Sequence, residues 1–246
     1  MKLKLLAFFC AVLTLASCQF TETMVLNEDG SGALSVEANL NEMMAFGGQA
    51  MADSMPMKLD TLIVMRQFLE AKKDSIATLS KEQQEKLKKM ENFNIHLQMD
   101  SEAGVMVYDV ATQFKNVAEA NDILNHLELA GSIIPDPSGK TEVKKEEDAP
   151  EIIGVNYSFN NGIFKRNAYI KDPALHQKEV DSLQQAAAFM GGSNYTLKYT
   201  FPKKITKASN PNATYSLDGK TITVQQPFLE YFKNPDLLDL EITLEK

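Results

Sequence analysis

The fold of this chain is limited most strongly by a series of short runs in which apolar and polar residues alternate. Turn residues separate these runs. Apolar and polar residues alternate strictly from Leu34 to Leu40, and Asp29-Gly30-Ser31-Gly32 precedes this run. Asn161-Gly162 and Asp218-Gly219 stand between other alternating runs, and such dipeptides favour the positive backbone angles of tight hairpins. A strand that alternates in this way shows one face to a core and one to water, which is typical of antiparallel sheets rather than of parallel βαβ folds.

Amphipathic helices are predicted between the hairpins. The expected helices cover residues 59–79, 80–90, 116–131 and 173–190. Ser80 with Gln83 forms a capping-box pattern, and Asp172 stands as an N-cap before Pro173. The sequence therefore predicts an α+β fold, a curved antiparallel β-sheet built from hairpins with amphipathic helices packed on one face.

Residues 1–17 differ from the rest of the chain. Lys2 and Lys4 make a basic start, the run from Leu5 to Leu15 is apolar, and Ala16 and Ser17 are small. The apolar run is too short to span a bilayer as a mature helix, so this segment is predicted to be a signal peptide that is removed.

The four residues Leu15-Ala16-Ser17-Cys18 resemble the lipobox of bacterial lipoproteins. The resemblance implies cleavage before Cys18, a diacylglycerol on its sulfur and usually a fatty acid such as palmitate on its amino group. It also implies a lipid anchor in the cell envelope, at the outer membrane because Gln19 rather than aspartate follows. The alternative is an ordinary secretory signal with a chance cysteine. Because Cys10 leaves with the signal, the mature chain would have no free thiol for disulfides, thiolate catalysis or metal binding.

The mature chain, residues 18–246, is predicted to form one α+β domain. Residues 135–150 include Lys144-Lys145-Glu146-Glu147-Asp148 and have no apolar period, so they are expected to form a mobile surface loop. The whole chain has a net charge of −8, and loss of the two signal lysines makes the body more acidic. An acidic body argues against nucleic acid as a partner. The expected partners are the membrane, through the anchor, and other envelope proteins.

No sequence motif of catalysis is present. The chain has no P-loop, nucleophile elbow or dinucleotide fingerprint, and His96, His126 and His176 have no paired ligand spacing. These histidines are expected on the surfaces of a strand and two helices. No catalytic residue, metal ligand or cofactor is therefore predicted, although a carboxylate pair assembled by the fold stays open. The predicted function is a non-enzymatic binding or assembly component of the envelope.

One segment is rich in methionine, and its candidate ligand-binding residues are Met43, Met44, Met51, Met55 and Met57. Methionine is a flexible filler of irregular cores, which is the simplest interpretation. An adaptable apolar lid over a cavity would instead make the protein a carrier of lipid or another hydrophobic ligand. A third interpretation is Cu(I) binding, because thioethers are soft ligands.

Two short blocks resemble the LppM-type lipoprotein domain. The first is the turn from Leu26 to Gly32, and the second combines Tyr199-Thr200-Phe201-Pro202 with Asp218-Gly219-Lys220-Thr221. The resemblance implies a membrane-tethered α+β domain able to contact lipids, and it transfers no catalytic residue.

Overall fold

The computed structural model describes residues 18–42, 44, 58–121, 152–185 and 187–246. The predicted signal peptide, the predicted loop at 135–150 and most of the methionine-rich segment lie outside these residues. The division into a removed signal and one mature domain stays a prediction.

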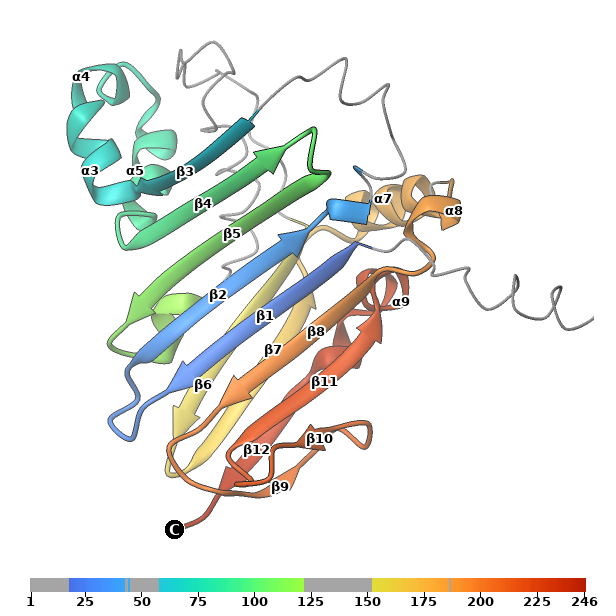
Figure 1. Cartoon of the computed structure of the whole chain (residues 1–246). Helices are drawn as coiled ribbons and strands as arrows, with labels where there is room; N and C mark the ends of the chain where they lie inside the picture. Colours follow the sequence, from blue (N-terminus) through green and yellow to red (C-terminus); the bar gives the residue numbers. More distant parts are fainter. Residues whose placement is uncertain (1–17, 43, 45–57, 122–151, 186) are drawn as a thin grey trace, which may run out of the picture.

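The larger sheet has eight strands in the order β10-β11-β8-β1-β2-β5-β4-β3 (Figure 1). Its strands are β1 (Gln19–Leu26), β2 (Gly32–Asn39), β3 (Lys58–Val64), β4 (Phe93–Asp100), β5 (Val105–Phe114), β8 (Asn194–Thr200), β10 (Thr214–Tyr215) and β11 (Thr221–Pro227). All neighbours are antiparallel except β1 and β8, which run parallel. The sequence did not predict this parallel pair, because alternation reports which face of a strand is buried and not the direction of its neighbour.

The smaller sheet has four strands in the order β6-β7-β12-β9. These are β6 (Ile153–Asn160), β7 (Ile163–Ile170), β9 (Ile205–Ala208) and β12 (Leu240–Leu244). Figure 1 shows β6, β7 and β12 behind the part of the larger sheet that contains β1, β2 and β8. Buried residues of both sheets belong to one core, among them Met24, Leu34, Val155, Phe164, Leu197, Phe201, Ile222 and Ile242. The predicted α+β class is confirmed, and a second sheet forms the layer that helices alone were expected to form.

The helices lie at the ends and side of the larger sheet (Figure 1). They are α3 (Met65–Ala71), α4 (Lys73–Ile76), α5 (Lys81–Lys89), the 3-10 helix η2 (Val117–Ala120), α7 (Pro173–Gln185), α8 (Ala187–Met190), α9 (Phe228–Lys233) and the 3-10 helix η3 (Pro235–Leu238). Helices α3, α4 and α5 form a helical lobe beside β3. Within the described residues, no helix is both long and apolar enough to cross a bilayer.

The predicted helix over residues 59–79 is wrong in its first part. Residues 58–64 form strand β3, which pairs with β4 through partners such as Ile63 and Ile95, and the helix begins at Met65. Thr61, Ile63 and Val64 are β-branched and favour a strand once a partner strand is available. The apolar spacing of this segment fits both the helical and the strand period, so pairing with β4 determines that it forms a strand.

The predicted starts of the helices at Ser80 and Asp172 are confirmed by their caps. The Gln83 amide donates to Ser80 Oγ and the Ser80 amide to Gln83 Oε1, each at 3.2 Å, which completes the capping box. Asp172 Oδ1 accepts from the amides of Ala174 and Leu175 at 3.0 Å each. These side chains satisfy amides that a helix start otherwise leaves unpaired.

A buried ion pair joins the two sheets. Glu22 of β1 and Arg166 of β7 are 0% and 1% exposed. Arg166 Nη2 lies 3.1 Å from Glu22 Oε2, and Arg166 Nε lies 3.3 Å from Glu22 Oε1. A further guanidinium nitrogen donates to the carbonyl oxygen of Leu238 at 3.2 Å. The two buried charges therefore have both the geometry and the additional hydrogen bonds that make such a pair tolerable.

Tyrosine hydroxyls complete this buried cluster. Tyr157 and Tyr195 donate to the Glu22 carboxylate at 2.6 and 2.8 Å, and Tyr199 donates to it as well. Burial and the nearby carboxylate raise the pKa of these three hydroxyls well above the ordinary value, which keeps them protonated as donors. The cluster is closed to solvent, so its role is to fix the packing of one sheet on the other.

Candidate functional site

The face of the larger sheet that points away from the smaller sheet is called the outer face here. On β1, β8 and β11 it is rich in hydroxyl side chains, namely Thr21, Thr23, Thr196, Thr200, Thr221 and Thr223. Thr21 is the register partner of Thr196, and the hydroxyls of Thr200 and Thr221 lie 2.9 Å apart. Such pairs stabilise neighbouring strands and make this part of the outer face largely polar.

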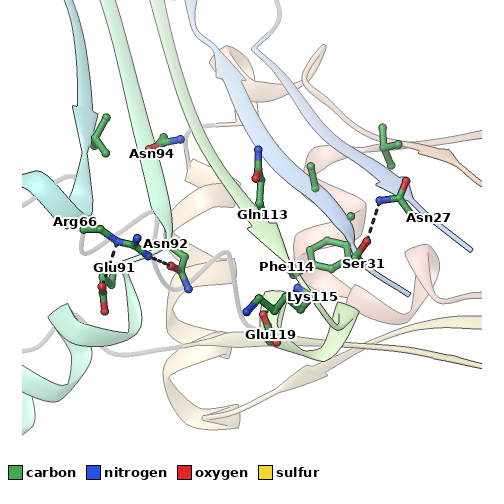
Figure 2. Close-up of a pocket in the computed structure, with 14 residues that line it drawn as sticks. Asn27, Ser31, Arg66, Glu91, Asn92, Asn94, Gln113, Phe114, Lys115 and Glu119 are labelled. Carbon is green, nitrogen blue, oxygen red and sulfur yellow. Dashed lines mark hydrogen bonds and ion pairs between the residues drawn. The ribbon is translucent and has the colours of Figure 1, made fainter. Parts of the chain in front are cut away.

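A groove of about 780 Å³ is formed on the outer face where β3, β4 and β5 meet the turn between β1 and β2 (Figure 2). Its apolar side chains are Val25, Ala33, Val64 and Phe114, and the side-chain amides of Asn94 and Gln113 lie among them. The sheet register brings these residues together from strands that are far apart in sequence.

Polar contacts define the ends of this groove. At one end Arg66 Nε lies 3.2 Å from Glu91 Oε1, and Arg66 Nη2 donates to Asn92 Oδ1 at 2.9 Å. At the other end Asn27 donates to Ser31 Oγ at 3.0 Å. Figure 2 shows the Arg66 group and the Asn27 group on opposite sides of Gln113. Both ends are therefore held by side-chain bonds within the protein.

The groove is electrically balanced. Two cations, Arg66 and Lys115, face two anions, Glu91 and Glu119. The residues that line it include no histidine, cysteine or tyrosine, so it contains no evident pair of nucleophile and base. Its chemistry suits a neutral ligand that forms hydrogen bonds with amides and hydroxyls.

The fold does assemble carboxylates that the sequence left unpaired. Glu37 of β2 is the register partner of Asp109 on β5, which is the partner of His96 on β4. His96 Nε2 lies 2.7 Å from Asp60 Oδ1. Partial burial raises the pKa of the Asp109 carboxyl, and the negative charge of Glu37 raises it further. Across the part of the chain that the structure describes, no group of three or more His, Cys, Asp or Glu side chains is arranged to hold a metal ion.

The predicted lipidation site, Cys18, lies at the start of the central strand β1. The side chain is 4% exposed, its amide donates to Ser193 Oγ at 3.2 Å, and its carbonyl accepts from the Asn194 amide at 3.2 Å. Burial raises the pKa of the Cys18 thiol. The cysteine is therefore part of the folded sheet end rather than of a separate linker, and its lipidation stays a prediction.

The other candidate residues are mostly outside the described part. Of Met43, Met44, Met51, Met55 and Met57, the structure describes Met44, which is buried. The structure therefore does not test whether these methionines form a lid or a Cu(I) site.

One histidine differs from its predicted surface position. His176 is 6% exposed, its Nε2 lies 2.7 Å from the carbonyl oxygen of Phe232, and its ring stacks on Phe232. His176 is buried because α9 packs on α7. The residue pattern of α7 alone does not indicate a contact with another helix. His126 lies outside the described residues, and His96 is on the outer face as predicted.

The groove was missed by sequence reasoning. Alternation correctly places Asn94 and Gln113 on a solvent side of their strands, but the groove depends on strand order and register, which the sequence does not specify. The fold and the outer face together define a two-sheet α+β protein with an open, polar sheet face.

Comparison with known proteins adds one structural likeness. No protein-family model and no curated protein matches the chain. The folded domain of LppM from Mycobacterium tuberculosis, solved by NMR, aligns over 93% of this chain and 89% of that chain, with 8% identity and a TM-score of 0.42. The two structures share too little for one to indicate the function of the other.

Proposed function

We propose that this protein is a lipid-anchored envelope protein that binds a partner or ligand without catalysing a reaction. The observation that carries this proposal is the direct continuity between Cys18 and the central strand β1 (Gln19–Leu26). An acyl chain on that sulfur holds the folded sheet at the membrane with no intervening spacer. The outer membrane is the proposed location, because Gln19 follows the cysteine.

The groove on the outer face is the proposed binding surface. Its balanced charges and unreactive side chains support binding rather than catalysis, and the amides of Asn94 and Gln113 are exposed for hydrogen bonds. A small number of oriented polar groups among apolar ones is typical of binding sites.

The anchor is tested by Cys18→Ala. We expect the variant to leave the membrane fraction, because it has no sulfur to acylate, and its signal to remain uncleaved or to be processed differently. Cys10→Ala is the matched control, since this cysteine lies inside the predicted signal. A Cys18→Ala chain that still sediments with membranes would rule out the lipid anchor.

The groove is tested by photo-crosslinking in intact cells. A photoreactive residue at Asn94 lies in the groove, whereas one at Gln98 lies on the same face of the same strand outside it. We expect a discrete crosslinked product from position 94 and a weaker one from position 98. Equal or absent crosslinking at both positions would contradict the groove as the binding surface.

A further inference from the structure

The hairpin between β10 and β11 ends in an exposed apolar tip. Leu217 is fully exposed and Tyr215 is 52% exposed, in a chain whose other described large apolar side chains are mostly buried. Isolated exposed leucines are common, so Leu217 indicates a contact site only in combination with the exposed tyrosine and the charged residues beside it.

Hydrogen bonds within the turn define the conformation of the tip. Asp218 Oδ1 accepts from the Lys220 amide at 3.0 Å, and the Gly219 amide donates to the Ser216 carbonyl at 3.0 Å. Gly219 has a φ of 69°, which this tight turn requires. Leu217 is therefore held out in water by the turn itself and has no apolar neighbour in the turn to cover it.

Three lysines, Lys203, Lys204 and Lys220, lie beside or within the turn. The amides of Phe201 and Ile205 donate to the carbonyls of Lys220 and Gly219 at 3.0 and 2.9 Å, which fixes the segment with Lys203 and Lys204 against the turn. The Cγ atom of Lys204 would lie 3.9 Å from a Cβ added at Gly219. Two nearby anions, Asp218 and Glu245, offset part of this charge, and the Asp218 carboxylate is engaged within the turn.

We propose that this tip is a second membrane contact, which inserts Leu217 and Tyr215 into the headgroup region of an anionic bilayer while Lys203, Lys204 and Lys220 face the lipid phosphates. An aromatic side chain and an aliphatic one beside lysines match the interface between headgroups and acyl chains. The lysines gain attraction from the negative surface of such a membrane.

The tip and Cys18 reach one membrane only when the strands of the larger sheet lie along its surface. The tip lies beyond Thr200, the register partner of Val25, so it is at the opposite end of β1 from Gln19, roughly 20 Å along the strand. Figure 1 shows the β10–β11 hairpin and the start of β1 at opposite ends of the sheet. In that orientation the tether to the anchor makes even a weak contact of the tip effective. This step rests on the proposed anchor, whereas the affinity of the tip for anionic lipid does not.

The chain contains no tryptophan, which allows a direct test. Leu217→Trp places a single reporter at the tip, and Leu62→Trp places one at another exposed leucine, 62% exposed on the outer face. The full chain is returned to phosphatidylcholine vesicles with or without phosphatidylglycerol. With anionic vesicles we expect emission from position 217 to shift to shorter wavelength and to be quenched by brominated acyl chains, with no such change at position 62. No shift at position 217, or equal shifts at both, would overturn the proposal.

The same vesicles test two further points, the role of the tip lysines and which membrane the tip contacts. The triple change Lys203→Gln, Lys204→Gln and Lys220→Gln should abolish the shift and its sensitivity to salt, while Lys81→Gln, Lys88→Gln and Lys89→Gln in the helical lobe should preserve both. Brominated lipid in the vesicle that carries the protein should quench position 217. Quenching only by added brominated vesicles would overturn contact with the same membrane. Cys18→Ala separates the tip from the anchor. If this variant leaves the membrane but emission from position 217 still shifts on added anionic vesicles, the tip binds lipid by itself, and a failed same-membrane result is due to the anchor.

Discussion

At the scale of single residues, Glu22 shows how alternation and chemistry diverge. Its position in the alternating strand β1 is an inward one, where the pattern predicts an apolar side chain, and the structure places a carboxylate there. The charge is stable in the core because Arg166 and three tyrosine hydroxyls bond it. The sequence does not reveal this pair, since the partners are 144 residues apart.

Glu22→Gln should strongly destabilise the fold. The change leaves the buried Arg166 charge without its counterion, and breaking a buried pair in this way costs about 3 to 5 kcal/mol. The free energy of unfolding from urea titration measures the effect. Glu37→Gln, an exposed change on β2, is the matched control and should alter stability by less than about 0.5 kcal/mol.

The Glu22–Arg166 pair also makes the stability of the fold depend on pH. Burial by itself raises the pKa of the Glu22 carboxyl, but the Arg166 charge and the hydrogen bonds from Arg166, Tyr157 and Tyr199 outweigh it and hold the pKa below its ordinary value of 4.5. The unfolded chain therefore binds the proton more readily. This contribution to stability is complete above about pH 4.5 and is lost as the pH falls toward the folded-state pKa.

The measurement is the urea midpoint between pH 7 and pH 3 for the natural chain and for Glu22→Leu with Arg166→Met. We expect the natural chain to lose stability below pH 4.5 more steeply than the double variant, which lacks the titrating group. Parallel curves would show that the pair contributes nothing to the acid response.

At the scale of elements, hairpins and helix starts were predictable because their signals are local. The Asn161-Gly162 turn has positive φ at both residues, as the dipeptide indicates, and the Ser80 cap forms as predicted. Strand β3 was not predictable, because its apolar spacing fits two periods and only pairing with β4 selects one. The groove needed the same non-local information, as Asn94 and Gln113 meet through register and not through sequence.

Ser80→Ala should loosen the helical lobe by about 1 kcal/mol, since it leaves the Gln83 amide at the start of α5 without its acceptor. Hydrogen exchange of the α5 amides should accelerate, while amides of the core strands β1 and β8 should keep their rates. Ser182→Ala, an exposed change within α7, is the control and should leave exchange in α5 unaffected. Equal acceleration in all elements would mean that the lobe does not open independently.

At the scale of the whole molecule, the place where the sheet begins limits when the proposed acylation of Cys18 can occur relative to folding. Cys18 is the residue before β1, its backbone bonds to Ser193 and Asn194, and its sulfur is buried. An enzyme that attaches a lipid needs this sulfur in the open. The proposed acylation of Cys18 therefore has to precede closure of this end of the sheet, or else requires the end to open locally.

Thiol labelling of the unacylated full chain distinguishes a closed end from an open one. With Cys10→Ala, Cys18 is the single thiol, and we expect maleimide to label it far more slowly than Leu62→Cys in a Cys10→Ala and Cys18→Ala background. Both burial and the raised pKa of the Cys18 thiol contribute, because the thiolate is the reactive form. Urea should remove the difference by unfolding the sheet. Equal rates in native buffer would show that this end is already open, so that the sulfur is accessible to an acylating enzyme after folding.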